Sequence, residues 1–305
     1  MSAVIVDNVV KKYGSKKEQV TALKGVSIDV KKGELFGIIG PDGAGKTSLF
    51  RVLTTLLLPD GGRATVDGMD VVKDYKAIRQ HVGYMPGRFS LYQDLTVAEN
   101  MEFFATIFNT TIEENYDLVK EIYSQIEPFK DRRAGKLSGG MKQKLALSCA
   151  LIHRPSVLFL DEPTTGVDAV SRKEFWEMLK RLKEQGITIL VSTPYMDEAS
   201  MCDRVALIQS GEIMSVNTPQ GIIDQFKNPL VAVKAATMLH LLNDLKEFPG
   251  QLDAYPFGEF HHVVLKEGNS ENELKNYLAG KGWKDIEMKK ITPDIEDCFM
   301  ALMKS

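Results

Sequence analysis

The chain has 305 residues, of which 44% are hydrophobic and 26% charged, and its formal net charge is −3. This length suffices for one large domain and a smaller one, and the composition is that of an ordinary globular protein. The small negative charge gives no electrostatic basis for binding nucleic acid or an anionic membrane. The three cysteines stand far apart without CxxC pairs, so they indicate neither a disulfide framework nor a zinc site.

The N-terminal segment MSAVIVDNVVKKYG alternates in polarity and becomes charged too early for a signal peptide. The apolar runs of the chain are far shorter than the roughly 18 residues that a membrane helix requires. We therefore expect a cytoplasmic protein, and any role at a membrane to be peripheral.

Four short, nearly continuous apolar runs recur at 34–40, 156–162, 187–193 and 204–209. Segments with helical spacing lie between them. Apolar runs that alternate with helices predict an α/β fold with a parallel sheet covered on both faces. Few strand signals occur between about 93 and 155, where Met141, Leu145, Cys149 and Ile152 follow a helical spacing, so this part predicts a helical subdomain.

After residue 225 the sequence has a different pattern of predicted strands and helices. Six segments read in order as strand, helix, strand, strand, helix and strand, at 230–236, 237–248, 251–257, 260–268, 271–282 and 285–291. This order is that of a split βαβ unit and predicts a small α+β domain over 226–305, after a first domain over 1–225. A last amphipathic helix begins near Pro293. The adjacent His261 and His262 should point to opposite faces of a strand, so they form no ready metal pair.

The segment GPDGAGKT at 40–47 matches the phosphate-loop pattern G-x-x-x-x-G-K-[ST]. It follows an apolar strand and precedes a helical run, so backbone N–H groups and the helix dipole can face a phosphate. Lys46 is suited to reach the outer phosphates, and Thr47 to bind Mg²⁺. The predicted nucleotide-binding residues of this segment are Gly40, Asp42, Gly43, Ala44, Gly45, Lys46, Thr47 and Ser48.

An acidic pair, Asp161 and Glu162, ends the apolar run SVLFLDE. Open α/β sheets bind their ligands at the carboxyl ends of the strands. Asp161 is suited to hold Mg²⁺ through water, and Glu162 to orient or deprotonate the attacking water as the catalytic residue. The pair is a weak signal alone and a strong one beside the phosphate loop.

The segment LSGGMKQ at 137–143 opens a helix with Ser138, Gly139 and Gly140 at its amino end. A hydroxyl, backbone N–H groups and a helix dipole can together bind a phosphate there. Between GPDGAGKT and LFLDEPTTGVD, this segment resembles the signature of the ABC (ATP-binding-cassette) ATPases. The resemblance covers about residues 3–225.

This resemblance implies an ATP- and Mg²⁺-binding cassette. Two cassettes of the family pair head to tail, so that Ser138, Gly139 and Gly140 would complete the ATP site of a partner cassette. Tyr13 matches the aromatic residue that stacks on adenine, and Asp168 matches the loop that couples the two sites. The segments TPDIEDCFMALM and YMPGRFSLYQDLTVAEN look most like ATPase subunits of bacterial drug, lipid or polysaccharide exporters. The implied partner is a separate transmembrane permease, with the chain at the inner face of the cell membrane.

Two positions depart from the family pattern. Gly87 stands where the family has the glutamine that helps to coordinate Mg²⁺ and water, and Pro194 stands where it has a histidine that donates to the γ-phosphate. Neither residue has a side-chain donor. We therefore expect ATP binding with slow or negligible hydrolysis at this site. Locally, Thr193 can serve as a helix N-cap and Pro194 as the first helical residue.

Two functions remain open at this point. The first is the ATP-binding subunit of an exporter, in which we favour a heteromeric cassette pair over a homodimer with two defective sites. The alternative is a soluble ATP-dependent scaffold or regulator of the same superfamily. The transported substrate is not specified by any motif of the chain.

Overall fold

The computed structural model describes residues 1–15 and 18–304. These residues form two compact units, which divide between Pro219 and Gln220, after the first residue of the short helix α7 (Pro219–Ile223). The sequence patterns placed this division six residues later, at 225. None of the helices described within residues 1–15 and 18–304 combines the length and the apolarity needed to cross a membrane.

A six-stranded sheet is the centre of the N-terminal unit, in the order β10-β9-β3-β8-β7-β6. Its strands are β3 (Leu35–Ile39), β6 (Val82–Met85), β7 (Val157–Asp161), β8 (Thr188–Thr193), β9 (Arg204–Gln209) and β10 (Glu212–Asn217). All neighbours pair in parallel except β10, which is antiparallel to β9. Every residue of β3, β7 and β8 is buried, as expected for parallel strands covered on both faces. The predicted α/β class is therefore confirmed.

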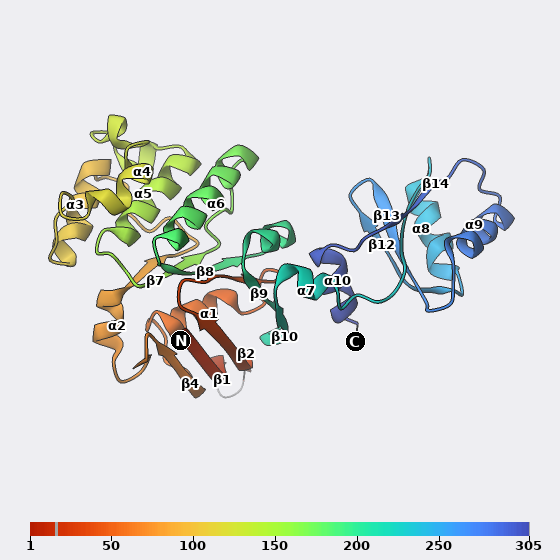
Figure 1. Cartoon of the computed structure of the whole chain (residues 1–305), viewed down its shortest axis with the longest axis horizontal. Coiled ribbons are helices and arrows are strands. Elements are labelled where there is room, and N and C mark those ends of the chain that lie inside the picture. Colours follow the sequence, from red (N-terminus) through yellow and green to blue (C-terminus); the bar gives the residue numbers. More distant parts are fainter. Residues whose placement is uncertain (16–17, 305) are drawn as a thin grey trace. The chain divides into compact units, whose positions relative to one another are not determined.

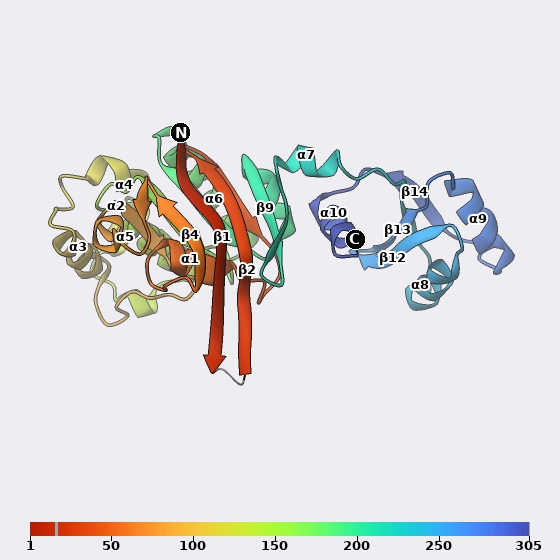
Figure 2. The same ribbon diagram turned by 90° about the horizontal axis from the view of Figure 1, so that it is seen from below.

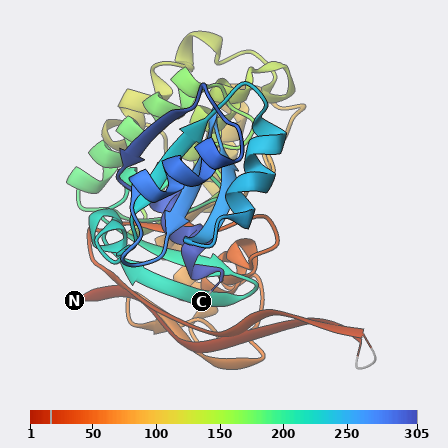
Figure 3. The same cartoon turned by 90° about the vertical axis from the view of Figure 1, so that its right-hand side faces the viewer.

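A second, antiparallel sheet has the order β2-β1-β4-β5. It contains β1 (Ser2–Ser15), β2 (Glu18–Lys31), β4 (Gly61–Val66) and β5 (Met69–Asp70). The hairpin of β1 and β2 stays paired as far as Ser15 opposite Glu18 and extends beyond β4 (Figure 2, Figure 3). The sequence patterns did not predict this sheet, whose inward side chains join the main core.

Helices cover the six-stranded sheet (Figure 1). They are α1 (Lys46–Leu53), α2 (Tyr75–His81) and α6 (Ala169–Glu184). Phe50 of α1 packs edge-on against Phe159 of β7, with ring centroids 5.7 Å apart. Burial of one such side chain stabilises the fold by about 1.5–3 kcal/mol, so this contact firmly places the helix that follows the phosphate loop.

The helical subdomain lies between β6 and β7. It consists of α3 (Val97–Ile107), α4 (Tyr116–Tyr123), α5 (Gly139–Leu151) and the short 3-10 helices η1 (Glu127–Phe129) and η2 (Ala134–Lys136). A capping box of Thr96 and Glu99 fixes the start of α3, because each side chain accepts from the other residue's backbone N–H. The helices gather on one side of the N-terminal unit (Figure 1).

The C-terminal unit has the predicted order of strands and helices. Its elements are β11 (Leu230–Lys234), α8 (Met238–Glu247), β12 (Gln251–Phe257), β13 (Phe260–Leu265), α9 (Glu271–Gly280), β14 (Glu287–Ile291) and α10 (Ile295–Leu302). The antiparallel sheet has the order β12-β13-β11-β14, which is that of a split βαβ fold. Helices α8 and α9 pack on one face of this sheet and α10 on the other (Figure 1).

The two adjacent histidines do point to opposite faces of β13. His261 donates from Nε2 to the Met238 carbonyl at the start of α8, at 2.7 Å. His262 bonds through Nδ1 to Asp297 Oδ1 of α10, at 2.6 Å, and the same oxygen accepts from the Tyr255 hydroxyl at 2.7 Å. Asp297 is only 1% exposed, so this carboxylate holds α10 onto the sheet.

Replacing this carboxylate should destabilise the C-terminal unit. Burial acts to raise the pKa of Asp297, but the hydrogen bonds from His262, the Asp294 backbone and Tyr255 hold it below its usual 3.8. A lowered folded-state pKa stabilises the fold above the unfolded pKa, and that stabilisation is lost as the pH falls through the folded value. We expect Asp297→Asn to lower the free energy of unfolding by about 2–3 kcal/mol at pH 7, with a difference that shrinks below about pH 4.

Urea unfolding followed by the fluorescence of Trp283 measures this effect, in a Trp176→Phe background that leaves this reporter in the C-terminal unit. The exposed Asp285 provides the control substitution, Asp285→Asn. An equal loss of stability at pH 7 and pH 3 would contradict the role of the Asp297 charge.

Candidate nucleotide-binding site

The phosphate loop joins β3 to α1, and its backbone is shaped by glycines. Gly43 and Gly45 have φ angles of +78° and +109°, in the left-handed region that favours glycine. At Gly45 a Cβ atom would lie only 2.6 Å from the Ala22 carbonyl oxygen. No side chain caps the amino end of α1. The first N–H groups of this helix therefore remain available to an anion such as a phosphate.

Lys46 is the first residue of α1 and is 3% exposed. Its Nζ donates to the carbonyl oxygens of Gly40 at 2.8 Å and Pro41 at 3.0 Å. The same atom lies 3.2 Å from Glu162 Oε1. A buried ammonium group needs such partners, and a phosphate oxygen could take the place of any of them.

Asp161 is fixed by two hydroxyl groups. Its Oδ1 accepts from Thr47 Oγ1 at 3.1 Å and from Ser192 Oγ at 2.6 Å, and the residue is 2% exposed. This brings together the two oxygen donors that the sequence assigned to Mg²⁺. Hydroxyl and carboxylate oxygens are the hard donors that Mg²⁺ prefers, so the residues present fit that ion.

Glu162 directly follows β7 with a φ of +49°, a conformation that is rare outside glycine. Its backbone N–H bonds to the carbonyl oxygen and the hydroxyl of Ser192, at 3.0 and 3.1 Å. The side chain remains 24% exposed. The fold thus maintains a strained backbone that aims the Glu162 carboxylate at Lys46.

A hollow of about 150 Å³ lies over these groups. Its lining residues are Ala22, Gly43, Gly45, Lys46, Thr47, Ser48 and Glu162. The Tyr13 hydroxyl donates to Ser48 Oγ at 3.1 Å, and its ring is 37% exposed at the edge of the same loop. Ala44 is buried and Asp42 exposed. Of the predicted residues, the structure brings Gly43, Gly45, Lys46, Thr47, Ser48 and Glu162 to this hollow, whereas Gly40, Asp42, Ala44 and Asp161 do not line it.

Gly87 lies against the peptide that joins Asp161 to Glu162. A Cβ atom at this glycine would be 3.0 Å from the Asp161 carbonyl oxygen and 3.7 Å from Glu162 Cβ. Gly87, the first of the two positions that depart from the family pattern, thus lies beside the acidic pair. It has no side chain that could reach into the hollow.

Pro194 follows the last residue of β8, at the edge where the phosphate loop begins. Thr193 pairs with Ile39, and its carbonyl accepts from the Gly40 N–H at 3.3 Å. The predicted helix start at this point is wrong, because the next helix is η3 (Met196–Met201), a 3-10 helix without a side-chain cap. The Thr193 hydroxyl caps no helix, since it accepts from the Tyr195 N–H at 3.1 Å and donates to Glu198 at 2.6 Å.

The signature segment lies elsewhere. Ser138 caps α5, and its Oγ accepts from the Met141 N–H at 3.3 Å. A Cβ atom at Gly139 would be 3.7 Å from the Gly166 carbonyl oxygen, and one at Gly140 would be 3.1 Å from Ser171 Oγ. None of Ser138, Gly139 and Gly140 lines the hollow over Lys46. The three residues form a separate helix end, beside the loop that leads to α6.

Asp168 caps α6 and accepts from the backbone N–H groups of Val170 and Ser171, at 3.1 and 3.0 Å. These hydrogen bonds, that of Ser171 first, hold the pKa of the Asp168 carboxyl below its usual value. The residue is therefore a charged helix cap at the exposed start of α6.

Three contacts were missed by the sequence patterns. Ser192 binds both members of the acidic pair, Gln143 Nε2 donates to the Pro163 carbonyl, and Glu198 accepts from Thr164 and Thr193. Gln143 lies in the signature segment, but its bond to Pro163 and the bonds of Ser192 and Thr164 join residues 20 to 34 positions apart, so local spacing does not predict them.

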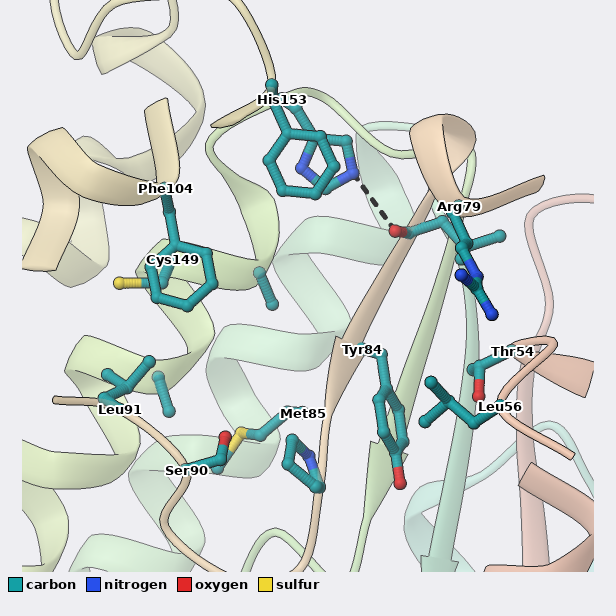
Figure 4. A pocket seen from close by; sticks show the side chains of 15 residues that line it. Thr54, Leu56, Arg79, Tyr84, Met85, Ser90, Leu91, Phe104, Cys149 and His153 are labelled. Atoms are coloured by element: carbon teal, nitrogen blue, oxygen red, sulfur yellow. Dashed lines mark hydrogen bonds between the residues drawn. The ribbon is translucent and has the colours of Figure 1, made fainter. Parts of the chain in front are cut away.

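A second hollow, of about 270 Å³, lies between β6 and the helical subdomain. Figure 4 shows Tyr84, Leu56 and Thr54 on one side of it, with Phe104, Leu91 and Cys149 on the other. Burial and the nearby Asp161 charge raise the pKa of Tyr84 to about 12, and burial lowers the pKa of His153 to about 4. Tyr84 and His153 are therefore uncharged at neutral pH, while the lining also includes the charged guanidinium of Arg79.

Comparisons with known proteins agree with this geometry. The sequence model of the family described as "ABC transporter" matches residues 23–165. The daunorubicin resistance ATP-binding protein DrrA2 of Streptomyces coeruleorubidus is 32% identical over 98% of this chain and 94% of its own length. The chain belongs to the ABC transporter family. The Nod factor export ATP-binding protein I of Burkholderia orbicola is 39% identical over 73% of this chain and 74% of its own length.

Solved structures of nucleotide-binding cassettes match most of the chain. A dimeric post-hydrolysis structure of the cassette MJ0796, bound to ADP and phosphate, superposes with a TM-score of 0.64 at 28% identity. It covers 70% of this chain and 98% of its own. The probable multidrug ABC transporter ATP-binding protein YbhF of Escherichia coli is 38% identical over 89% of this chain. The chain spans 47% of YbhF, about half the length of that relative.

Proposed function

We propose that this chain is the ATP-binding subunit of an ABC exporter that works with a separate membrane-spanning subunit. The names of the relatives support export, since they describe drug resistance, probable multidrug transport and Nod factor export. The observation that carries the proposal is the convergence of Lys46, Thr47 and Glu162 around one hollow, with Asp161 hydrogen-bonded to Thr47. The chain would act at the inner face of the membrane.

In this proposal the phosphates of ATP bind to the N–H groups of the loop and to Lys46, which exchanges its contact with Glu162 for phosphate oxygens. The Tyr13 ring, which is partly exposed beside Ser48, would stack on the adenine. Thr47 and Asp161 would hold Mg²⁺, which neutralises charge on the phosphate oxygens when bound. Glu162 would orient the attacking water.

The same site lacks two groups for hydrolysis. Gly87 leaves the acidic pair without an amide beside it, and Pro194 offers no donor at the edge of β8. We therefore propose that this site binds ATP and hydrolyses it slowly. Ser138, Gly139 and Gly140, which lie apart from the hollow, would complete the ATP site of a partner cassette. In a heteromeric pair this signature would complete a site that hydrolyses ATP well, whereas in a homodimer it would complete only a second weak site.

Measurements on the purified chain and on its complex test the proposal. We expect the chain alone to bind MgATP and to turn it over at a rate about 10²-fold below that of the complex isolated from membranes through a tag on this chain. Lys46→Ala should abolish binding to the chain and serves as the blank. Fast turnover by the chain alone would contradict the weak site, and failure to recover any membrane subunit would contradict the exporter.

A further inference from the structure

A buried carboxylate connects the segments around the acidic pair. Glu198 of η3 is 3% exposed, and its Oε2 accepts from Thr193 Oγ1 at 2.6 Å and from Thr164 Oγ1 at 3.1 Å. Its Oε1 has no hydrogen-bond partner among the described residues and lies 3.8 Å from Arg172 Nε. Buried groups that are only partly satisfied are uncommon in folded proteins, and this one calls for an explanation.

One of the two threonines belongs to the loop that follows Glu162, and the other to the strand end beside the phosphate loop. Thr164 lies in the loop after Glu162, where the Thr165 N–H bonds to the Glu162 carbonyl at 3.2 Å and the Val167 N–H to the Thr164 carbonyl at 3.3 Å. Thr193 ends β8 and accepts the Gly40 N–H of the phosphate loop. One carboxylate oxygen therefore bridges the loop of Glu162 to the strand beside the phosphate loop.

A third segment reaches the same carboxylate through Arg172, in the first turn of α6. The Arg172 N–H bonds to the carbonyl of the cap residue Asp168 at 2.9 Å. The Arg172 guanidinium bonds to Asp197 Oδ2 at 3.1 Å and lies 4.7 Å from the centroid of the Tyr195 ring. The start of α6 is thus held to η3 and to the residue before it by an ion pair, a hydrogen bond and a cation–π contact.

Pro194 lies in the turn that this network spans. A proline has no N–H, so the turn between β8 and η3 has no backbone donor at that position. The described bonds across the turn are Tyr195 N–H to Thr193 Oγ1 and Glu198 N–H to the Tyr195 carbonyl, at 3.1 and 3.3 Å. The Thr193 side chain therefore supplies one of the two bonds that fix the path of this turn.

We propose that Glu198 is a positioning residue, which holds the Glu162 loop in register with the phosphate loop and joins both to the start of α6. It acts through Thr164 and Thr193 and does not itself contact ATP. The effect of Glu198 on ATP hydrolysis rests on the proposed function, whereas its role in positioning the Glu162 loop of the free chain does not.

Hydrogen exchange of the full chain without nucleotide directly tests whether Glu198 holds the Glu162 loop in place. In Glu198→Ala we expect amide exchange at least about tenfold faster in peptides covering 162–168 and 193–198, with the strands of the C-terminal unit unchanged. Glu198→Gln should restore slow exchange, because its amide oxygen can accept from both threonine hydroxyls. Glu212→Ala, which removes an exposed partner of Lys24, is the control.

Kinetics of the purified chain, in which Glu162 serves its own site, form the second arm. Glu198→Ala should lower the slow kcat of this chain for MgATP by about tenfold through misplacement of Glu162, while KM stays within about twofold because the ATP contacts are untouched. If the wild-type complex hydrolyses no ATP, the proposed function fails and the exchange arm still decides this inference. Unchanged exchange in 162–168, or faster exchange spread evenly over the N-terminal unit, would overturn it.

Discussion

Gly87→Gln combined with Pro194→His is expected to raise ATP hydrolysis at this chain's own site by on the order of 10²-fold. One preorganised donor to a transition-state charge is commonly worth 10²- to 10³-fold in rate. Two such donors at the same phosphate act as a unit, so their effects should not multiply. Each single substitution should therefore recover less than the pair.

The structure shows how well each position can accept the new side chain. Position 194 lies in a turn that precedes η3, so histidine carries no helix cost there. At position 87 the new Cβ would be 3.0 Å from the Asp161 carbonyl oxygen, so the chain must shift by a few tenths of an ångström. Gly87→Ala with Pro194→Ala is the matched control, because it brings the same Cβ contact and releases the proline without adding a donor.

Steady-state phosphate release from the tagged complex provides the measurement, and the rate at this chain's own site is the part of it that Glu162→Gln removes. Adding Glu162→Gln to the restored pair should remove the gain, because the water would lose its carboxylate partner. A restored pair that hydrolyses ATP no faster than the alanine control, in a complex that is assembled, would show that the missing groups do not limit this site.

Local patterns were enough to predict the core of the cassette. The runs at β3, β7, β8 and β9 are nearly continuous in apolar residues, and such runs predict buried parallel strands without knowledge of distant contacts. The phosphate loop was equally accessible, since its glycines are required by the positive φ angles that the structure shows. These features depend on residues that are close together in the chain.

The antiparallel sheet was missed because its pattern is interrupted. The pairing of β1 with β2 shifts register between Val6 and Val9 and again between Val9 and Val10. Each shift breaks the alternation of inward and outward side chains on which a strand prediction depends. The long hairpin is therefore visible only once both strands are paired.

The incorrect helix start at Pro194 has a similar cause. Thr193 and Pro194 have the local chemistry of a helix N-terminus, but a carboxylate five residues later takes the threonine hydroxyl. The second hydroxyl on that carboxylate belongs to Thr164, 34 residues before Glu198 in the chain. A contact of this range has no local signal, so only the folded structure reveals it.

The second large effect concerns the signature end of α5. Gly139→Asp is expected to reduce ATP hydrolysis by the assembled complex by at least about 10²-fold, while leaving the ATP affinity of this chain's own loop unchanged. The new carboxylate would occupy the helix N-terminus at which a partner's phosphate should bind, and the two negative charges repel. The own phosphate loop is unaffected because Gly139 does not line its hollow.

The fold should tolerate this substitution, which makes the result interpretable. A Cβ atom at Gly139 would have its nearest contact at 3.7 Å, an ordinary van der Waals distance, and aspartate suits the first turn of a helix. Gly280→Asp, at the end of α9 with no atom within 4 Å of the added Cβ, is the matched control. If the Gly139→Asp complex assembles and still hydrolyses ATP at the wild-type rate, the signature of this chain completes no partner's site. The hydrolysis must then come from a site that does not use this signature.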